Sequence, residues 1–162
     1  MSTQSRVDVS SPATPENGAF QFLGLPTLIH ASAQSTNGAY GLVEHPSMTP
    51  GFATPYHMHH REDEAFYVIE GEVAFVLDGA WKRVGPGAFI YGPREIPHGF
   101  KIVGNTPARM LILSTPAGFE SFVLELARPL DEPPAPPDMP KLIAAAARAG
   151  IDILGPLPEE PA

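Results

Sequence analysis

Two histidines and a glutamate are the residues of this chain whose types and spacing are best suited to chemistry. His57 and His59 are separated by one residue in the segment GFATPYHMHHREDEAFYVIEG, and Glu64 follows just before an aromatic and β-branched run. Side chains at positions i and i+2 of a β-strand point to the same face, so the two imidazoles can aim at a single point. Imidazole and carboxylate groups that converge are typical of a metal site. The spacing therefore predicts a metal-binding strand.

The composition favours an all-β fold and excludes some partners. Hydrophobic residues make up 43% of the 162 residues and charged residues 17%, with 15 Gly and 20 Pro, which favours short strands joined by turns. The formal net charge of -8 would repel nucleic acid and anionic membranes. The chain contains no cysteine, which excludes disulfides and thiolate ligands. No apolar leader and no run of 18 apolar residues is found, so we expect a cytoplasmic protein.

The N-terminal two thirds of the chain is expected to form one β-barrel. Residues 1–18 are rich in Ser, Thr and Pro and predict a flexible arm. Residues 19–116 contain short apolar segments broken by turn residues, which predict a sandwich or small barrel. Within them, the run from residue 64 to residue 84 predicts a meander of paired strands, with a break at Gly71 and a hairpin turn at Asp78-Gly79.

The C-terminal third predicts helices and an extended tail. Residues 117–128 predict a packing helix on the outside of the barrel, because apolar residues recur there at helical spacing. These apolar residues are Phe119, Phe122, Val123 and Leu126. Residues 129–162 predict a Pro-rich connector, a short Ala-rich helix ended by Gly150 and an extended tail.

The segment that carries the two histidines resembles the first motif of the cupin superfamily, G-x5-H-x-H-x4-E-x6-G. Every fixed position is matched, by Gly51, His57, His59, Glu64 and Gly71. The second motif of that family, G-x5-P-x-G-x2-H-x3-N, is matched by Gly87, Pro93 and His98. Glu95 stands where a glycine is usual and Ile102 where an asparagine is usual, and neither position is a ligand in the family.

This resemblance implies a double-stranded β-helix, a jelly-roll barrel, with short C-terminal helices. It also implies that one divalent transition metal is held by His57, His59, Glu64 and His98. Iron, nickel, manganese, cobalt, copper and zinc all suit these donors, so the metal stays open. Three neutral imidazoles and one carboxylate around a divalent ion leave a charge of about +1, which favours an anionic oxygen such as an enolate.

Strand parity predicts an aromatic and apolar pocket beside the ligands. Phe66 and Val68 share the parity of Glu64, and Phe100 and Ile102 share that of His98. Tyr91 and Met110 are further pocket candidates, although core packing also explains them.

For the other histidines and for the carboxylates near the motif, we expect surface or structural roles. His60 has the opposite parity to the ligands, so we expect its ring to face solvent. His30 and His45 are expected to have structural roles on earlier strands. Glu62 and Asp63 predict a solvated turn, with a proton relay as the alternative.

The resemblance extends to single-domain bacterial cupins similar to quercetin dioxygenase. It implies a dioxygenase acting with dioxygen on a small enolic or phenolic substrate, flavonol- or polyketide-like, with Glu64 as the catalytic base. A metal-dependent isomerase or cyclase and a noncatalytic small-molecule binder are the alternatives. Related single-barrel proteins usually pair, so a homodimer is expected.

Overall fold

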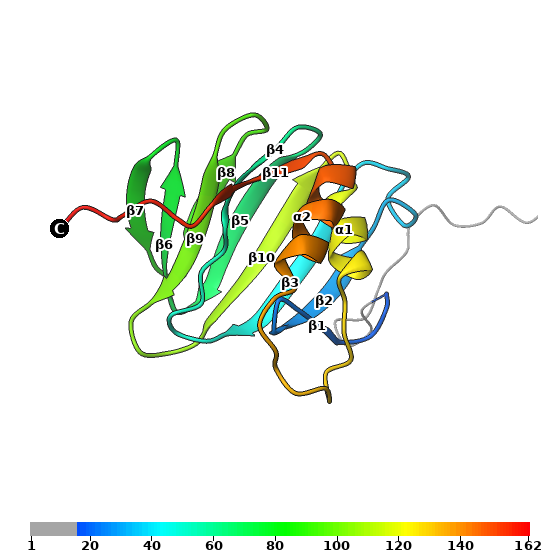
Figure 1. Cartoon of the computed structure of the whole chain (residues 1–162), viewed down its shortest axis with the longest axis horizontal. Coiled ribbons are helices and arrows are strands. Elements are labelled where there is room, and N and C mark those ends of the chain that lie inside the picture. The colour runs from blue at the N-terminus through cyan, green and yellow to red at the C-terminus, as the bar shows by residue number, and fades with distance from the viewer. Residues whose placement is uncertain (1–15) are drawn as a thin grey trace, which may run out of the picture.

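Two antiparallel β-sheets that face each other form the body of the protein (Figure 1). The computed structural model describes residues 16–162, so the predicted arm lies outside the described residues except for residues 16–18. The six-stranded sheet has the order β1 (Phe20–Phe22), β2 (Leu25–Ala31), β3 (Gly41–Met48), β10 (Ala108–Thr115), β5 (Asp63–Glu70) and β8 (Phe89–Gly92). The five-stranded sheet has the order β11 (Ile151–Gly155), β4 (Tyr56–His59), β9 (His98–Val103), β6 (Glu72–Leu77) and β7 (Ala80–Val84). The predicted double-stranded β-helix is confirmed.

The hydrophobic core lies between the two sheets and follows strand alternation. In the central strand β10, alternate residues are buried, and Met110 and Ile112 are 0% and 4% exposed. Phe75 on β6 and Phe100 on β9 meet them from the opposite sheet, with ring centroids 5.6 Å apart. Burial of each such side chain stabilises the fold by about 1.5–3 kcal/mol. The core thereby holds the two sheets face to face.

The predicted meander is wrong at Gly71, where the chain changes sheets. β5 pairs with β10 and β8, whereas β6 pairs with β9 and β7. Gly71 has a φ of 82°, and a Cβ there would lie 2.6 Å from the Cα of Ala108. Glycine is therefore required for both the left-handed conformation and the close approach. The predicted hairpin turn is confirmed, since Asp78 and Gly79 join β6 to β7 with φ of 46° and 78°.

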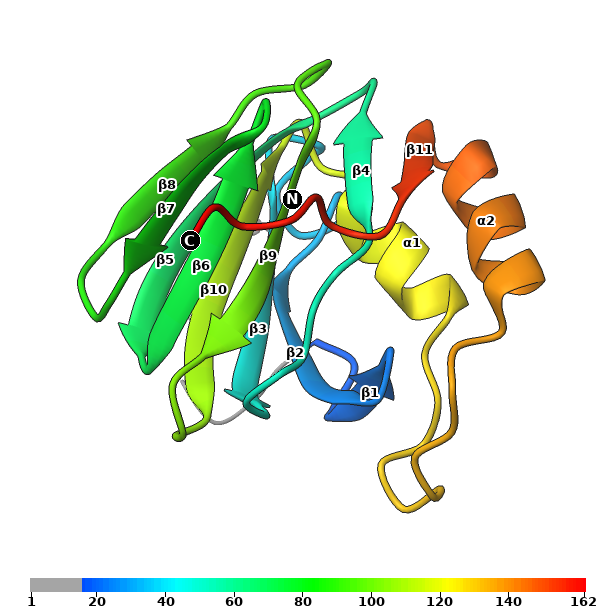
Figure 2. The same cartoon turned by 60° about the vertical axis from the view of Figure 1, so that its left-hand side comes forward.

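The first helix, α1 (Phe119–Glu125), is part of the core and does not pack on the outside of the barrel as predicted. Figure 2 shows α1 and α2 (Met139–Arg148) at the side where β1 and β2 of one sheet face β4 and β11 of the other. Phe119, Phe122 and Val123 are all buried. The ring of Phe122 meets that of Phe22 at 5.8 Å in an edge arrangement. The helix therefore closes one side of the sandwich.

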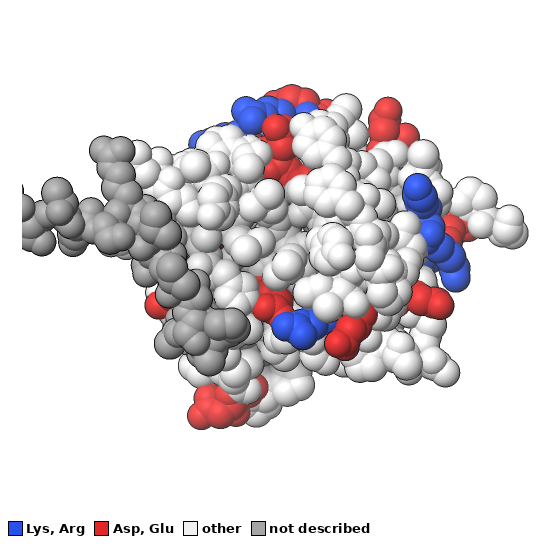
Figure 3. All heavy atoms as spheres, turned by 180° about the vertical axis from the view of Figure 1, so that it is seen from behind, with Lys and Arg blue, Asp and Glu red and all other residues white. Residues whose placement is uncertain are grey.

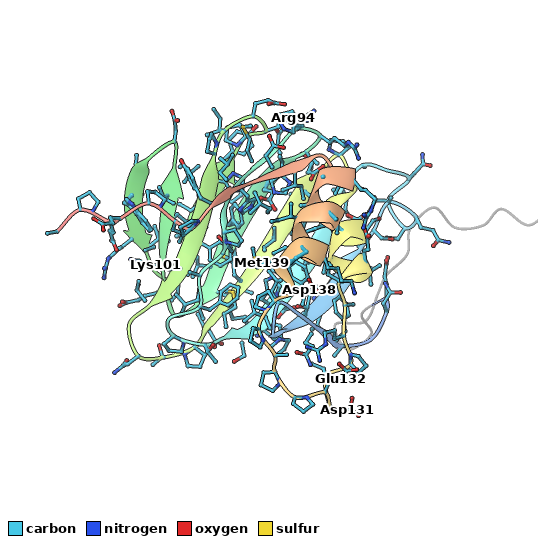
Figure 4. The ribbon with its side chains drawn as sticks, viewed as in Figure 1. Arg94, Lys101, Asp131, Glu132, Asp138 and Met139 are labelled. Carbon is cyan, nitrogen blue, oxygen red and sulfur yellow. The ribbon has the colours of Figure 1, made fainter. Side chains whose placement is uncertain are left out.

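The C-terminal segment returns to the barrel after a Pro-rich loop. Asp131 and Glu132 lie on this loop, which extends away from the sheets (Figure 4). Asp138 then caps α2, since its carboxylate accepts a hydrogen bond of 3.1 Å from the backbone N–H of Lys141. Beyond α2, part of the predicted tail forms β11, which pairs with β4. Within residues 16–162, neither helix is long and apolar enough to cross a membrane.

Candidate metal centre

The four residues predicted as ligands come together between the two sheets. His57 and His59 lie on β4, and His98 lies opposite His57 on the neighbouring strand β9. Glu64 lies on β5 in the other sheet. The candidate ligands of the two sequence motifs are thus brought together by the pairing of β4 with β9 and by the packing of one sheet on the other.

Each histidine ring is held through its Nδ1 atom. The Nδ1 of His57 lies 2.8 Å from the carbonyl oxygen of Pro55, and the Nδ1 of His98 lies 3.0 Å from that of Ile96. Nδ1 of His59 lies 2.6 Å from a carboxylate oxygen of Glu62. Carbonyl and carboxylate oxygens accept hydrogen bonds, so Nδ1 is the donor in all three rings. In the neutral imidazoles, Nε2 therefore carries the free lone pair.

The three Nε2 atoms converge on one carboxylate oxygen. Oε2 of Glu64 lies 2.6 Å from Nε2 of His98, 3.0 Å from that of His59 and 3.9 Å from that of His57. All four candidate ligand atoms lie within 4.8 Å of one another. Donors bound about 2.1 Å from one ion would be at most about 4.2 Å apart, so the cluster is close to the spacing that coordination needs.

Burial and mutual attraction govern the charges of the metal-free cluster. Burial raises the pKa of Glu64, but the three histidines outweigh it and hold that pKa well below its ordinary value. Burial lowers the pKa of His59, yet Glu64 and Glu62 outweigh it and raise the pKa to about 10. Burial is the main reason that the pKa of His57 is lowered. Near neutral pH, the metal-free cluster thus contains an ionised Glu64 beside a protonated His59.

The donor set fits a single divalent metal ion. Once the proton of His59 is lost, the imidazoles point lone pairs at a carboxylate that also only accepts, and an ion between them removes this repulsion. Nε2 of His59 is buried and has no hydrogen-bond partner among the described residues, although Glu64 lies within 3.0 Å without hydrogen-bond geometry. A buried ring nitrogen without a well-formed hydrogen bond is unfavourable unless a ligand pairs with it. The identity of the metal stays open among those named above.

Glu62 does not lie in a solvated turn as the sequence predicted. Its side chain is 3% exposed and contacts Nδ1 of His59. It therefore orients this candidate ligand from the side of the ring opposite Nε2. Asp63 does lie near the surface, where it pairs with Arg94 at 3.0 Å. The only sequence signal for Glu62 was its position between the two ligands His59 and Glu64.

The two departures from the second motif leave the strand that carries His98 in place. Glu95 adopts a φ of 64°, the left-handed conformation that the usual glycine would provide without strain. Its backbone N–H donates to the carbonyl of His59 at 2.8 Å, which ties the two motifs together. Ile102 is 2% exposed and packs in the hydrophobic core.

An apolar cavity of about 60 Å³ adjoins the cluster. Of the predicted pocket residues, Phe66 and Phe100 line it. Val68, Ile102 and Met110 do not line it and lie in the core between the sheets. Tyr91 is 53% exposed on the outer side of its sheet and does not line it either. Strand parity correctly predicted that the buried residues point inward. It did not predict which of them lie beside the cavity and which lie in the core.

Residues from outside the two motifs complete the cavity wall. The Phe119 ring of α1 packs 5.6 Å from that of His59, and Leu142 of α2 and Ile151 of β11 also line the cavity. His45, for which only a structural role was expected, lines it as well. By contrast, His60 is half exposed and binds Glu95 and Asp152 outside the cluster, as its parity predicted.

Comparison with known proteins shows what this fold and site resemble. Residues 46–114, less than half of the chain, match the family model described as the cupin domain. The fold is a double-stranded β-helix with a buried cluster of three histidines and one glutamate. The uncharacterized protein MJ1618 of Methanocaldococcus jannaschii is 35% identical over 66 residues, which is 41% of this chain. The chain spans about half the length of that curated relative, 53%.

Two solved structures show the same fold. KdgF from Halomonas sp. superposes with a TM-score of 0.59 at 21% identity, over 70% of this chain and 99% of that one. An RmlC-like cupin from Shewanella frigidimarina gives a TM-score of 0.55 at 21% identity, over 69% of this chain and 96% of that one. Structural similarity at such low sequence identity shows only the fold, so the activity must be argued from the site itself.

Proposed function

We propose that this protein is a metal-dependent dioxygenase that acts on a small enolic or phenolic substrate. The observation that carries the proposal is the convergence of three imidazole lone pairs and a buried carboxylate next to an apolar cavity. His57, His59, Glu64 and His98 would hold one divalent transition metal. When bound, such an ion supplies positive charge and open positions for an anionic substrate oxygen and for dioxygen.

Glu64 is the proposed proton acceptor. Its carboxylate is buried beside the cavity and is ionised, because the surrounding histidines hold its pKa low. A carboxylate of low pKa accepts protons only from acidic groups. An enol or phenol near a divalent charge is such a group, whereas an ordinary alcohol is not, which favours the proposed substrate class.

The cavity walls support a reaction that must be protected from water. Phe66, Phe100 and Phe119 surround the cluster with aromatic carbon. An apolar wall strengthens electrostatic interactions inside the site and limits side reactions of an anionic substrate with water. Flat aromatic rings also suit a flat, conjugated substrate.

Metal analysis of the purified protein tests the first part of the proposal. We expect one metal ion per chain in the unaltered protein and in His60→Ala, whose ring lies outside the cluster. We expect His57→Ala and His98→Ala to lose it. Stoichiometric metal in both of the latter variants would show that the ion is bound elsewhere.

Oxygen consumption with a panel of flavonols, other enols and aromatic polyketides tests the second part. Uptake of dioxygen that depends on the metal supports a dioxygenase. Product formation without oxygen uptake would instead indicate an isomerase or cyclase that uses the metal as a Lewis acid. Binding without any product would indicate a noncatalytic binder.

A further inference from the structure

His45 occupies a wall of the cavity remote from the metal cluster. It lies on β3, opposite Met110 of β10, and Met110 in turn lies opposite Val68 of β5. His45 is therefore two strands across and four residues along from Glu64. With ordinary strand dimensions, the two Cα atoms are roughly 16 Å apart. Both side chains nevertheless line the same cavity.

The hydrogen bonds on one side of the His45 ring define which nitrogen carries the proton. Nδ1 lies 3.1 Å from Oγ1 of Thr27 and 3.4 Å from the carbonyl oxygen of Pro26. The Thr27 hydroxyl donates its proton to the carbonyl of Leu25 at 2.9 Å, so its oxygen is free to accept. Nδ1–H is therefore the donor to Thr27 and Pro26, and Nε2 carries a lone pair.

The ring is also rigid and neutral. It is 3% exposed and stacks on Phe22, with ring centroids 6.4 Å apart and an interplanar angle of 11°. Burial lowers the pKa of His45 to about 4, although Pro26 and Glu44 oppose this change. At neutral pH, Nε2 thus acts as a fixed hydrogen-bond acceptor.

The rest of the cavity offers few polar groups to a ligand. Apart from the residues of the metal cluster, Thr54 and His45 are the lining residues with polar side chains. The Thr54 hydroxyl oxygen already accepts a hydrogen bond of 3.1 Å from the backbone N–H of Phe100. Nε2 of His45 has no partner among residues 16–162. An unpaired acceptor in an apolar cavity wall gains from a ligand that brings a donor.

We propose that His45 is a substrate-binding residue that accepts a hydrogen bond from a hydroxyl group at the end of the substrate remote from the metal cluster. This inference rests on the proposed function, which places the acidic oxygen of the substrate at the cluster. The substrate class is thereby narrowed to flat, elongated molecules with an acidic oxygen at one end and a hydroxyl at the other.

A matched pair of probes tests this substrate class. The probes are 6-hydroxy-2-naphthoate and 2-naphthoate, which differ only in the remote hydroxyl, and the protein is loaded with redox-inert zinc so that no turnover occurs. Titration calorimetry should show that the hydroxylated probe binds about fivefold more tightly, the effect of one neutral hydrogen bond. Equal affinities, or no binding of either probe, would overturn the inference.

Two variants separate binding from a purely structural role of His45. In His45→Asn the side-chain amide can replace Nδ1 and keep the contact with β2, but nothing replaces Nε2. In His45→Gln the amide reaches the position of Nε2. We expect the Asn variant to lose the preference for the hydroxylated probe and the Gln variant to keep part of it. An Asn variant that folds and retains the full preference would contradict the inference.

A spectroscopic measurement on the unaltered protein keeps the test independent of the folding of these variants. The 15N shift of His45 Nε2 should change when the hydroxylated probe binds, and much less with 2-naphthoate. The same shift change with both probes would argue against a hydrogen bond to the hydroxyl. Failure of the metal-binding proposal would show itself separately, as absence of zinc from the cluster in the metal analysis.

Discussion

Oε1 of Glu62 lies 2.6 Å from Nδ1 of His59, and both side chains are buried. The carboxylate therefore holds the ring with its Nε2 directed at Glu64. Contacts of this kind fix the tautomer and raise the basicity of a metal ligand. Glu62 lies outside the motif positions that predict ligands, yet its contact bears directly on how tightly the cluster can bind an ion.

Removal of the Glu62 carboxylate should weaken metal binding. We expect Glu62→Ala to lower the affinity for zinc by about 10- to 100-fold, because His59 loses the partner that orients it. Glu62→Gln, which retains an acceptor oxygen, should lose less. Competition with a chelator of known affinity measures the change, and Glu70→Ala, at an exposed position of β5, serves as the control. Equal affinities for Glu62→Ala and the control would refute the role of Glu62.

Metal binding should release a proton and should become tighter as the pH rises. The pKa of His59 is raised to about 10 by Glu64 and Glu62 against the opposing effect of burial, so the metal-free protein carries a proton there at pH 7. An ion must displace that proton, which predicts an affinity gain of about tenfold per pH unit below pH 10. Calorimetry in two buffers of different ionisation enthalpy measures the released proton. A heat independent of the buffer would contradict this prediction.

The same shift predicts how the stability of the metal-free protein varies with pH. A histidine whose pKa is raised on folding stabilises the fold fully below its unfolded value of about 6.5. This contribution is lost as the pH rises toward 10, the folded value of His59. Urea unfolding of the metal-free protein should therefore give a lower free energy at pH 9 than at pH 6. His59→Gln should show a weaker dependence, and an unchanged slope would count against the assignment.

Gly71 should tolerate substitution much less than another glycine with similar backbone angles. Gly71 and Gly79 have φ of 82° and 78°, but a Cβ would collide with Ala108 at Gly71 and meet nothing within 4 Å at Gly79. Gly79→Ala should cost about 1–2 kcal/mol of unfolding free energy for the left-handed conformation alone. Gly71→Ala should cost at least about 2 kcal/mol more, because the backbone must shift. Equal losses in urea unfolding would show that the close approach is relieved easily.

The outer face of the six-stranded sheet is the surface through which we expect a homodimer to form. Tyr67, Phe89 and Tyr91 are 45%, 64% and 53% exposed there, and Tyr67 lies opposite Phe89 in the β5–β8 pair. Figure 3 shows the side of this sheet, on which charged side chains are sparse. Exposed apolar patches of this kind mark interaction sites, and β8 is also an open sheet edge.

Light scattering coupled to size-exclusion chromatography tests this expectation. The unaltered protein should have the mass of a dimer, and Phe89→Glu should shift it to the mass of a monomer, because a charge would be buried in the interface. Ile143→Glu is the control, since Ile143 is 50% exposed on α2 at a different surface. A monomer mass for the unaltered protein would rule out the dimer.

Local patterns in the sequence determined the strand content, the hairpin at Asp78-Gly79 and three of the four candidate ligands. These predictions need only relations between near neighbours. Residues two apart on a strand share a face, and an Asp-Gly pair fits a tight turn, whatever the rest of the chain does. His98 was the exception. It was predicted because its segment resembles a second family motif, since no local pattern relates it to His57, which lies far away in the sequence.

Only the tertiary structure decided which elements cover the site and which side chains they bury. The change of sheets at Gly71, the burial of Glu62, the place of Phe119 in the cavity wall and the exposure of Tyr91 all depend on segments far away in the sequence. Parity states that a side chain points inward or outward, but burial depends on what lies against that face. For the same reason His45, a residue without any motif around it, is recognised as part of the cavity only when β2, β3 and the metal cluster are seen together.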